Sequence, residues 1–299
     1  MNVFITGGTG FIGGHLVRAL VERGDTVIIA TRSPEKKSDS QSVRHVTLED
    51  GLSGHLEGCD VVVNLAGESL FGKRWTNSVK KRLRGSRIRT TRSLVEAMGR
   101  LDSKPALFLS ASGVGYYGEC GSDTVVEDRP AGDDFLAELC QDWELAAREA
   151  EQFGIRVVTP RIGVALGREG GALSTMLPVF RAFIGGSIGA GTQYFPWIHV
   201  EDLCRSFLFA MDSSAISGPY NASAPNPVTM DEFAKALGKS ISRPSMFRVP
   251  EFGLNLVLGE AAIMITTSLN VIPKKILGEG FRFRFEHVDD ALKDLLADG

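Results

Sequence analysis

The sequence predicts a doubly wound α/β fold with a smaller, irregular C-terminal lobe. In the first half of the chain, continuous runs of Val, Ile and Leu alternate with helix-like segments, a pattern typical of parallel strands buried on both faces. A glycine-rich segment, TGGTGFIG at residues 6–13, joins the first of these runs to the first helical segment. Strand, glycine turn and helix in that order favour a parallel Rossmann sheet with helices on both faces.

The expected strands are short and follow one another at the spacing of βαβ units. Helical patterns over residues 15–23 and 78–98 lie between them. We expect residues 1–165 to form the Rossmann domain, with later segments returning to it. The strands are expected at residues 3–5, 26–30, 43–48, 60–65, 106–109 and 156–159.

The chain changes character from about Gly163. Glycine pairs at 170–171 and 185–186 are followed by short helical patterns at 230–237 and 289–296. We expect residues 166–299 to form a smaller substrate lobe, which includes a C-terminal module from about residue 249. Its loops should close over the carboxyl edge of the sheet, where folds of this kind bind ligands.

The glycine segment predicts a nucleotide-phosphate cradle. Gly7 permits a tight turn out of the strand, Gly10 lets backbone N–H groups approach a pyrophosphate, and Gly13 lets the first helix pack closely on the sheet. The helix N-terminus then faces the negative charge. The backbone of the intervening residues completes the predicted cofactor contacts, which are Thr9, Phe11 and Ile12.

The residues after the second strand favour NADP(H) over NAD. An NAD-binding chain would place a carboxylate there for the ribose 2′-OH, but this chain has Thr31, Arg32 and Ser33. The Arg32 guanidinium matches a 2′-phosphate, and the two hydroxyls add donors. The alternative is an exposed arginine at a strand end.

Two further segments extend the predicted cofactor site. Leu65, Ala66 and Gly67 close the fourth strand, where small residues suit close approach to the adenosine and ribose. Arg87, with Lys80 and Arg84 on one face of a helix, is placed to reach the phosphates. The alternative for these basic residues is a solvated helix face.

Composition disfavours several classes of partner. A formal net charge of −3 and an isoelectric point of about 6.0 favour neither nucleic acid nor an anionic membrane, so we expect a small-molecule substrate. The four cysteines show no metal-binding spacing. With no signal peptide and no run of 18 apolar residues, a cytoplasmic location is expected. A homodimer and a regulatory protein partner both stay open.

Taken together, these motifs resemble the extended short-chain dehydrogenase/reductase superfamily, and more narrowly its atypical "epimerase family" branch. That branch is implied to bind NADP, and its members have no established substrate. The resemblance covers nearly the whole chain. It is carried by residues 6–13, 64–68, 74–75, 110–118, 143–144, 160–163, 185–189 and 197–202, and by Pro273 and Lys274 in the C-terminal module.

The superfamily's catalytic Tyr-x-x-x-Lys pair is missing. In each case the residue four positions after a tyrosine is not lysine, and the helix positions where the resemblance places the pair are Leu136 and Cys140. An unassisted tyrosine, with a pKa of about 10, is ionised at roughly one part in a thousand at pH 7. Ordinary epimerase or reductase turnover therefore lacks its usual base.

Three other residues are candidates for the chemistry. Ser112 matches the superfamily serine that hydrogen-bonds a substrate oxygen, Tyr117 is the nearest phenol, and Glu68 follows a strand end as a possible general base. The alternatives are a pocket-lining role for Tyr117 and a plain loop carboxylate for Glu68.

Several other conspicuous residues have competing interpretations. We expect His199 to order its loop and Asp202 to cap the following helix, rather than to act as acid and base. Cys140 is expected to be an inert core thiol. An aromatic substrate wall and core packing are equally open for Trp75, Phe195 and Trp197.

The sequence thus predicts an NADP(H)-binding oxidoreductase or epimerase-like protein that acts on a small carbonyl or hydroxyl compound. The alternative is a cofactor-binding sensor or regulator without turnover, which the missing Tyr–Lys pair favours.

Overall fold

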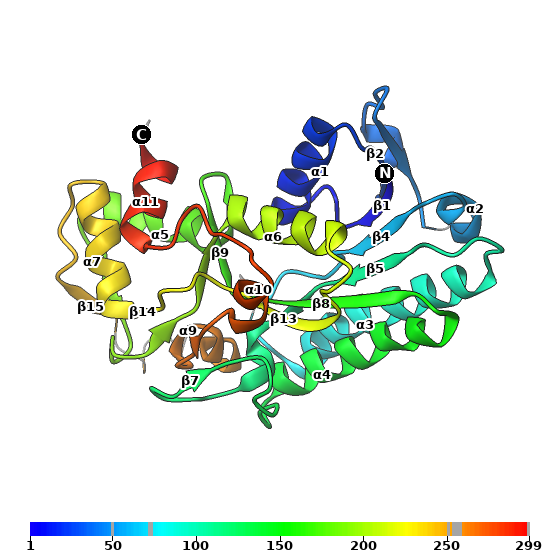
Figure 1. Ribbon diagram of the computed structural model, residues 1–299. Helices are drawn as coiled ribbons and strands as arrows, with labels where there is room; N and C mark the ends of the chain where they lie inside the picture. The colour runs from blue at the N-terminus through cyan, green and yellow to red at the C-terminus, as the bar shows by residue number, and fades with distance from the viewer. Residues whose placement is uncertain (49–50, 71–73, 250–251, 253–258, 298–299) are drawn as a thin grey trace.

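The computed structural model describes residues 1–48, 51–70, 74–249, 252 and 259–297. A parallel sheet runs through the molecule in the order β3-β2-β1-β4-β5-β8-β13, and the short strand β6 (Ser112–Gly113) extends it beside β8 (Figure 1). The predicted doubly wound α/β fold is confirmed. The strands of the main path are β1 (Asn2–Thr6), β2 (Thr26–Ala30), β3 (Val43–Val46), β4 (Val61–Asn64), β5 (Leu107–Ser110), β8 (Arg156–Ile162) and β13 (Gly218–Ala222).

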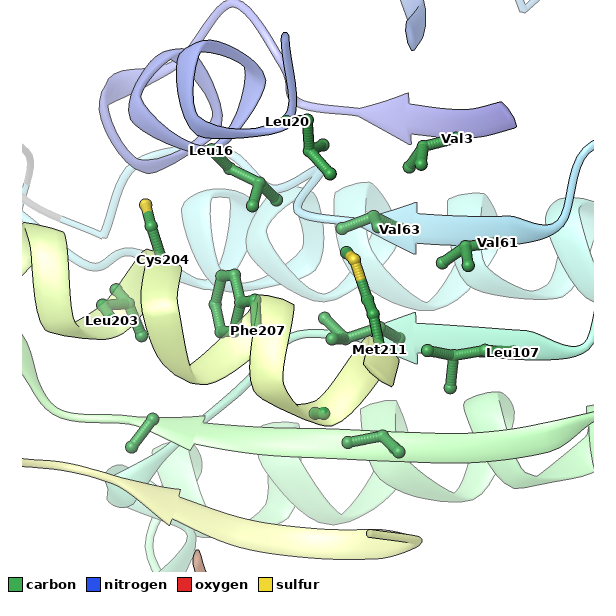
Figure 2. Packing of buried hydrophobic residues seen from close by; sticks show 14 of the residues in the cluster. Val3, Leu16, Leu20, Val61, Val63, Leu107, Leu203, Cys204, Phe207 and Met211 are labelled. Atoms are coloured by element: carbon green, nitrogen blue, oxygen red, sulfur yellow. The ribbon is translucent and has the colours of Figure 1, made fainter. Parts of the chain in front are cut away.

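One face of the sheet is covered by α1 (Phe11–Arg23) and α6 (Val200–Asp212). Alternate strand residues such as Val3 and Val63 belong to one apolar cluster with Leu16, Leu20 and Phe207 of these helices (Figure 2). Because successive strand side chains point to opposite faces, one helix layer is needed on each side.

The other face is covered by α2 (Leu52–Leu56), α3 (Asn77–Arg100) and α4 (Phe135–Arg148). Phe4, Val62 and Phe108 of the strands are fully buried beneath them. Side chains cap the two long helices: Thr76 accepts from the N–H of Val79 in α3, and Asp134 accepts from the N–H of Ala137 in α4.

A second core lies in the C-terminal part of the chain, built by α5 (Gly171–Arg181), α7 (Met230–Ser240) and α11 (Val288–Leu296) around Trp197 and Phe233. Two-stranded pairs tie this part together. They are β12 (Trp197–His199) with β9 (Val164–Gly167), β10 (Gly186–Ile188) with β15 (Phe247–Val249), β11 (Tyr194–Phe195) with β14 (Val228–Thr229), and β16 (Asn270–Val271) with β7 (Thr124–Val125).

The remaining elements are single turns of helix. They are η1 (Pro34–Lys36), η2 (Val114–Tyr117), η3 (Glu149–Phe153), η4 (Gly259–Ala262), α9 (Ile263–Thr266) and α10 (Lys274–Gly278). Within the described ranges, no helix is long and apolar enough to cross a bilayer.

Strand β13 was not among the expected strands. Its sequence, GPYNA, carries Gly, Pro and Asn instead of an apolar run. Pro219 is tolerated because β13 is the last strand of the sheet and pairs only with β8.

Candidate functional site

The glycine loop lies where β1 meets α1, and its backbone is packed too closely for side chains. Gly7 has a left-handed φ of 75°, and a Cβ there would lie 2.6 Å from the Leu65 carbonyl oxygen. A Cβ at Gly13 would lie 2.2 Å from the Gly7 carbonyl oxygen. Gly13 therefore allows α1 to approach the loop itself, whereas the sequence had suggested contact with the sheet.

The first turn of α1 is open to a ligand. Gly10 occupies the N-cap without any side-chain cap, and it and Thr9 are exposed. The N–H groups of a helix's first turn have no partner within the helix. The Phe11 side chain packs on the turn between β9 and α5. A Cβ at Gly167 in that turn would lie 2.5 Å from the Phe11 ring. The arrangement suits an anion held by backbone N–H groups.

A buried polar network fixes the strand ends beside this loop. Asn64, at the end of β4, accepts from the Thr6 hydroxyl at 2.7 Å and donates to Thr91 and Ser110 at 2.8 and 3.2 Å. All four side chains are buried. Because these bonds join β1, β4, β5 and α3, they hold the glycine loop and residues 65–67 in one register.

Arg87 lies beneath residues 65–67 rather than out in solvent. Only 8% of it is exposed, and it donates to the carbonyl oxygens of Leu83 and Glu68 at 3.2 and 3.1 Å. A Cβ at Gly67 would lie 3.0 Å from the guanidinium carbon. The alternative of a solvated helix face is therefore excluded for Arg87, whose donors satisfy buried carbonyls, and its contact with the phosphates stays a prediction.

Arg32 has the opposite environment. It is exposed, just beyond β2, and forms no hydrogen bond or ion pair with any other residue in the described ranges. Thr31 and Ser33 on either side are half-buried, and the Thr31 N–H donates to the Val46 carbonyl at 2.8 Å. The guanidinium is thus available at the end of β2.

A cavity of about 310 Å³ opens between the sheet's carboxyl edge and the C-terminal part of the chain. Phe11 and Ile12 form one side, residues 113–115 and α4 another, and β8–β9 with residues 193–196 a third. Five residues of 263–269 also line it, as do Leu70, Met230 and the start of α5; the five are Ile263, Met264, Ile265, Thr267 and Leu269. The cavity adjoins the loop that follows β1, the strand at which the strand order reverses.

Leu136 and Cys140 of α4 both line this cavity. Burial, with the nearby Glu144 carboxylate, raises the pKa of the Cys140 thiol to about 11. A protonated, buried thiol and an aliphatic side chain thus occupy the wall where the resemblance places a Tyr–Lys pair.

Tyr117 does not line the cavity. It is 2% exposed; its hydroxyl donates to Asn221 Oδ1 at 2.6 Å and accepts from Arg161 at 3.0 Å. Burial raises the pKa of Tyr117 to about 12 despite the arginine. These contacts argue against Tyr117 as the group that transfers a proton.

Ser112 lies one layer behind the cavity wall. Its hydroxyl donates to Glu144 Oε1 at 2.8 Å, and Arg161 binds the same carboxylate through two bonds of 2.8 and 2.9 Å. Its neighbour Gly113 faces the cavity, whereas Ser112 is 4% exposed. With its one proton directed to Glu144, Ser112 is placed to accept a hydrogen bond rather than to donate one.

Glu68 is also absent from the cavity wall. Its N–H donates to Ser86 Oγ at 3.1 Å, and its carboxylate lies 3.5 Å from Arg82 Nε on α3. Its geometry is that of a loop carboxylate paired with the neighbouring helix. None of the three predicted catalytic residues therefore borders the cavity directly.

His199 and Asp202 are structural residues in this arrangement. His199 Nδ1 caps α6 by accepting from the N–H of Glu201, and its ring stacks on Phe285. Asp202 accepts from the N–H groups of Arg284 and Phe285. The expected cap is thus provided by His199, while Asp202 anchors the C-terminal segment to α6.

The three aromatic residues considered for a substrate wall, Trp75, Phe195 and Trp197, lie in different surroundings. Phe195 lines the cavity. Trp197 is 1% exposed in the second core, and Trp75 packs on Phe135 behind the wall. Sequence reasoning passed over Tyr194, a half-buried cavity residue whose hydroxyl has no hydrogen-bond partner among the described residues. Alternation along β11 does not reveal it, because the strand has only two residues.

The sequence matches the NAD dependent epimerase/dehydratase family over residues 3–223. The chain belongs to this family. Residues 249–295 match a further family, a domain of unknown function named DUF1731. The epimerase-family resemblance and its C-terminal module, both expected from the motifs, are thereby confirmed.

The similarity of this epimerase/dehydratase family member to its relatives extends over its full length. "Epimerase family protein YfhF" of Bacillus subtilis is 39% identical, covering 100% of this chain and 99% of that protein. "Epimerase family protein SDR39U1 homolog, chloroplastic" of Arabidopsis thaliana is 38% identical, covering 99% of this chain and 87% of that protein.

Solved structures agree. The crystal structure of human epimerase family protein SDR39U1 (isoform2) with NADPH has a TM-score of 0.91 at 35% identity, and the match covers 100% of both chains. UDP-glucuronic acid 4-epimerase from Bacillus cereus, in complex with UDP-glucuronic acid and NAD, has a TM-score of 0.80 at 19% identity over 99% of this chain and 98% of that one. At that identity the likeness is one of fold alone.

Proposed function

We propose that this chain is an NADP(H)-binding oxidoreductase or epimerase-like protein that acts on a small carbonyl or hydroxyl compound. The glycine loop carries the proposal, because its backbone is packed so tightly at Gly7 and Gly13 that Cβ atoms would clash, while the N-terminus of α1 is left without a side-chain cap. The human SDR39U1 structure with NADPH supports the choice of cofactor.

The residues present fit a dinucleotide. Backbone N–H groups of the first turn of α1 would bind the pyrophosphate, and residues 65–67 would pass along the adenosine and ribose. When bound, the nicotinamide would supply a site that accepts or gives a hydride. We assign the cofactor contacts to Gly7, Thr9, Gly10, Phe11, Ile12, Gly13, Thr31, Arg32, Ser33, Leu65, Ala66 and Gly67, with Arg87 supporting residues 65–67 from below.

Arg32 is the residue we expect to select NADP(H). Replacing it (Arg32→Ala) should raise the NADPH dissociation constant at least tenfold and leave that of NADH nearly unchanged, because a hydrogen bond to a charged phosphate contributes about 1.5–3 kcal/mol. Calorimetric titration of the purified protein with each cofactor measures this.

The matched control is Arg100→Ala. Arg100 is also an exposed arginine, with its side chain 75% accessible at the end of α3. Arg100→Ala should leave the dissociation constants of NADPH and NADH unchanged. Equal weakening of NADPH and NADH by Arg32→Ala would contradict the assignment of NADP(H), and no binding of either cofactor would contradict the proposed function.

For a reduction, a hydride and a proton must both reach the substrate carbonyl. We assign the proton to Tyr194, the one tyrosine among the described cavity residues. Ser112 is a positioning residue, because Glu144 and Arg161 hold it behind Gly113.

The second candidate is a cofactor-binding sensor without turnover. The apolar wall at Leu136 and Cys140 favours it, since neither side chain replaces a phenolate and an ammonium. Exchange of labelled hydride between NADPH and added carbonyl compounds separates the two. Tight NADPH binding without any exchange would favour the sensor.

A further inference from the structure

We propose that residues 263–269, which belong to the C-terminal module at residues 249–295, complete an apolar wall of the substrate cavity and make it selective for a neutral, apolar ketone or its alcohol over a nucleotide sugar. The inference rests on the proposed function, since it names the substrate class of that site. The module's match is to a domain of unknown function.

The module contributes Ile263, Met264 and Ile265 to the cavity. All three line the cavity and are half-buried, and Ile263 and Met264 also pack on the cluster around Trp75 and Leu83. Leu136 and Ile162, which also line the cavity, are half-buried in the same way, and Leu136 packs in the same apolar cluster as Ile263 and Met264. In the free protein part of this apolar surface is exposed to water, and an apolar ligand that covers it is favoured by the hydrophobic effect.

This wall is anchored at the C-terminal end of the apolar segment. The Ser268 N–H donates to the Glu119 carboxylate at 2.9 Å, and the Ser268 hydroxyl accepts from the Tyr194 N–H at 3.0 Å. Gln193 Nε2 donates to the Ile265 carbonyl at 3.3 Å. The module is thus tied to the strand that carries Tyr194, so the apolar wall and the proposed proton donor are held together.

The cavity offers little to a diphosphate. Among the described lining residues the one charged side chain is Asp134, which is an anion and already caps α4. Arg161 lies behind the wall and is held by Glu144. The uncapped N-terminus of α5, at Gly171, supplies only about half a positive charge against two negative ones. Among the described lining residues, a nucleotide sugar would find no cation to pair with its buried phosphates.

The test measures binding and requires no turnover. Calorimetry with the full chain, alone and with NADP⁺, compares 2-hexanone, 2-octanone, 2-decanone and UDP-glucose. We expect the ketone dissociation constant to fall roughly fourfold per added methylene, since about 0.8 kcal/mol accompanies burial of each. UDP-glucose should give no saturable binding.

Two variants locate the site. Met264→Glu places a carboxylate in the wall and should weaken 2-decanone at least tenfold, whereas Met246→Glu makes the same change at an 83% exposed methionine outside the cavity and should change nothing. Met264→Trp fills space without adding charge and should weaken 2-decanone more than 2-hexanone. Circular dichroism verifies that each variant is folded.

Three results would overturn the proposal: saturable binding of UDP-glucose, no binding of any ketone, or equal losses in Met264→Glu and Met246→Glu. NADPH titration is scored separately. Cofactor binding without ketone binding contradicts the cavity proposal alone, and ketone binding without cofactor binding contradicts the proposed function.

Discussion

The four tyrosines of the chain occupy very different surroundings. Tyr117 and Tyr220 are buried, and burial raises the pKa of both phenols, to about 12 for Tyr117. The Tyr116 ring lies 3.4 Å from the Arg161 guanidinium. Tyr194 alone of the four lines the cavity. At the scale of single residues, access to the cavity therefore decides which phenol is a candidate acid.

Replacing Tyr194 with phenylalanine removes the hydroxyl while keeping the ring. If Tyr194 supplies the proton, hydride transfer from NADPH to a bound ketone should slow by roughly 10² or more, the usual contribution of a positioned acid. The NADPH and 2-decanone dissociation constants should change by less than about threefold. Initial rates of label transfer and calorimetry measure the two effects.

Tyr116→Phe is the matched control, because Tyr116 is also half-buried but does not line the cavity. It should retain the rate of hydride transfer. An unchanged rate in Tyr194→Phe would remove Tyr194 from the mechanism and leave the cofactor assignment untouched.

The sequence predicted the close packing of the glycine loop better than the surroundings of the candidate catalytic residues, and the reason is physical. Glycines 7, 10 and 13 act through their own backbone, so local spacing is enough to recognise them. The role of Tyr117 depends on Asn221, which is 104 residues away, and on Arg161. Burial created by such distant partners cannot be read from the residue type.

At the scale of elements, helix α1 contains two adjacent glycines with opposite surroundings. A Cβ at Gly13 would lie 2.2 Å from the Gly7 carbonyl oxygen, whereas a Cβ at Gly14 would meet nothing within 4 Å beyond its own helix. Replacing each glycine with alanine therefore distinguishes the effect of close packing at Gly13 from the effect of helix propensity at Gly14.

Gly13→Ala should displace the loop, lower the free energy of unfolding and weaken NADPH at least tenfold. Gly14→Ala should raise the free energy of unfolding by about 0.5–1 kcal/mol, because alanine loses less conformational entropy in a helix. Urea unfolding of the cofactor-free protein and NADPH titration check both. Similar effects from the two variants would contradict the close packing at Gly13.

Elements with regular apolar patterns were predictable from sequence. Elements that form only through contacts with distant parts of the chain were not. The first five main-sheet strands, β1 to β5, were expected to within about two residues. β1, β2, β4 and β5 are largely buried apolar runs, whereas β3, VRHV, buries only Val46. β13 lacks such a run and pairs only because the chain returns to β8 at the sheet edge. The burial of Arg87 could not be read from the sequence either, because it depends on contacts with Gly67 and with the Glu68 carbonyl.

At the scale of the whole molecule, the C-terminal segment is fastened to α6. Arg284 and Phe285 donate to Asp202, which is fully buried. His199 stacks on Phe285, and its Nε2 lies 3.4 Å from the Asp294 carboxylate on α11. One short stretch, residues 199–202, thus joins α6, which covers the main sheet, to the C-terminal segment.

This junction makes stability depend on pH. Burial lowers the pKa of His199 below its ordinary 6.5, although Asp294, Glu201 and Asp202 oppose the shift. The unfolded chain therefore binds the proton more readily than the folded one, and the free energy of unfolding should fall as pH decreases below about 6.5.

His199→Asn keeps a capping side chain but does not titrate, so its unfolding free energy should vary less between pH 7 and 5. The control His287→Asn changes an exposed histidine and should retain the wild-type pH dependence. Urea unfolding at each pH measures all three proteins, and an unchanged slope in His199→Asn would assign the pH dependence to other groups.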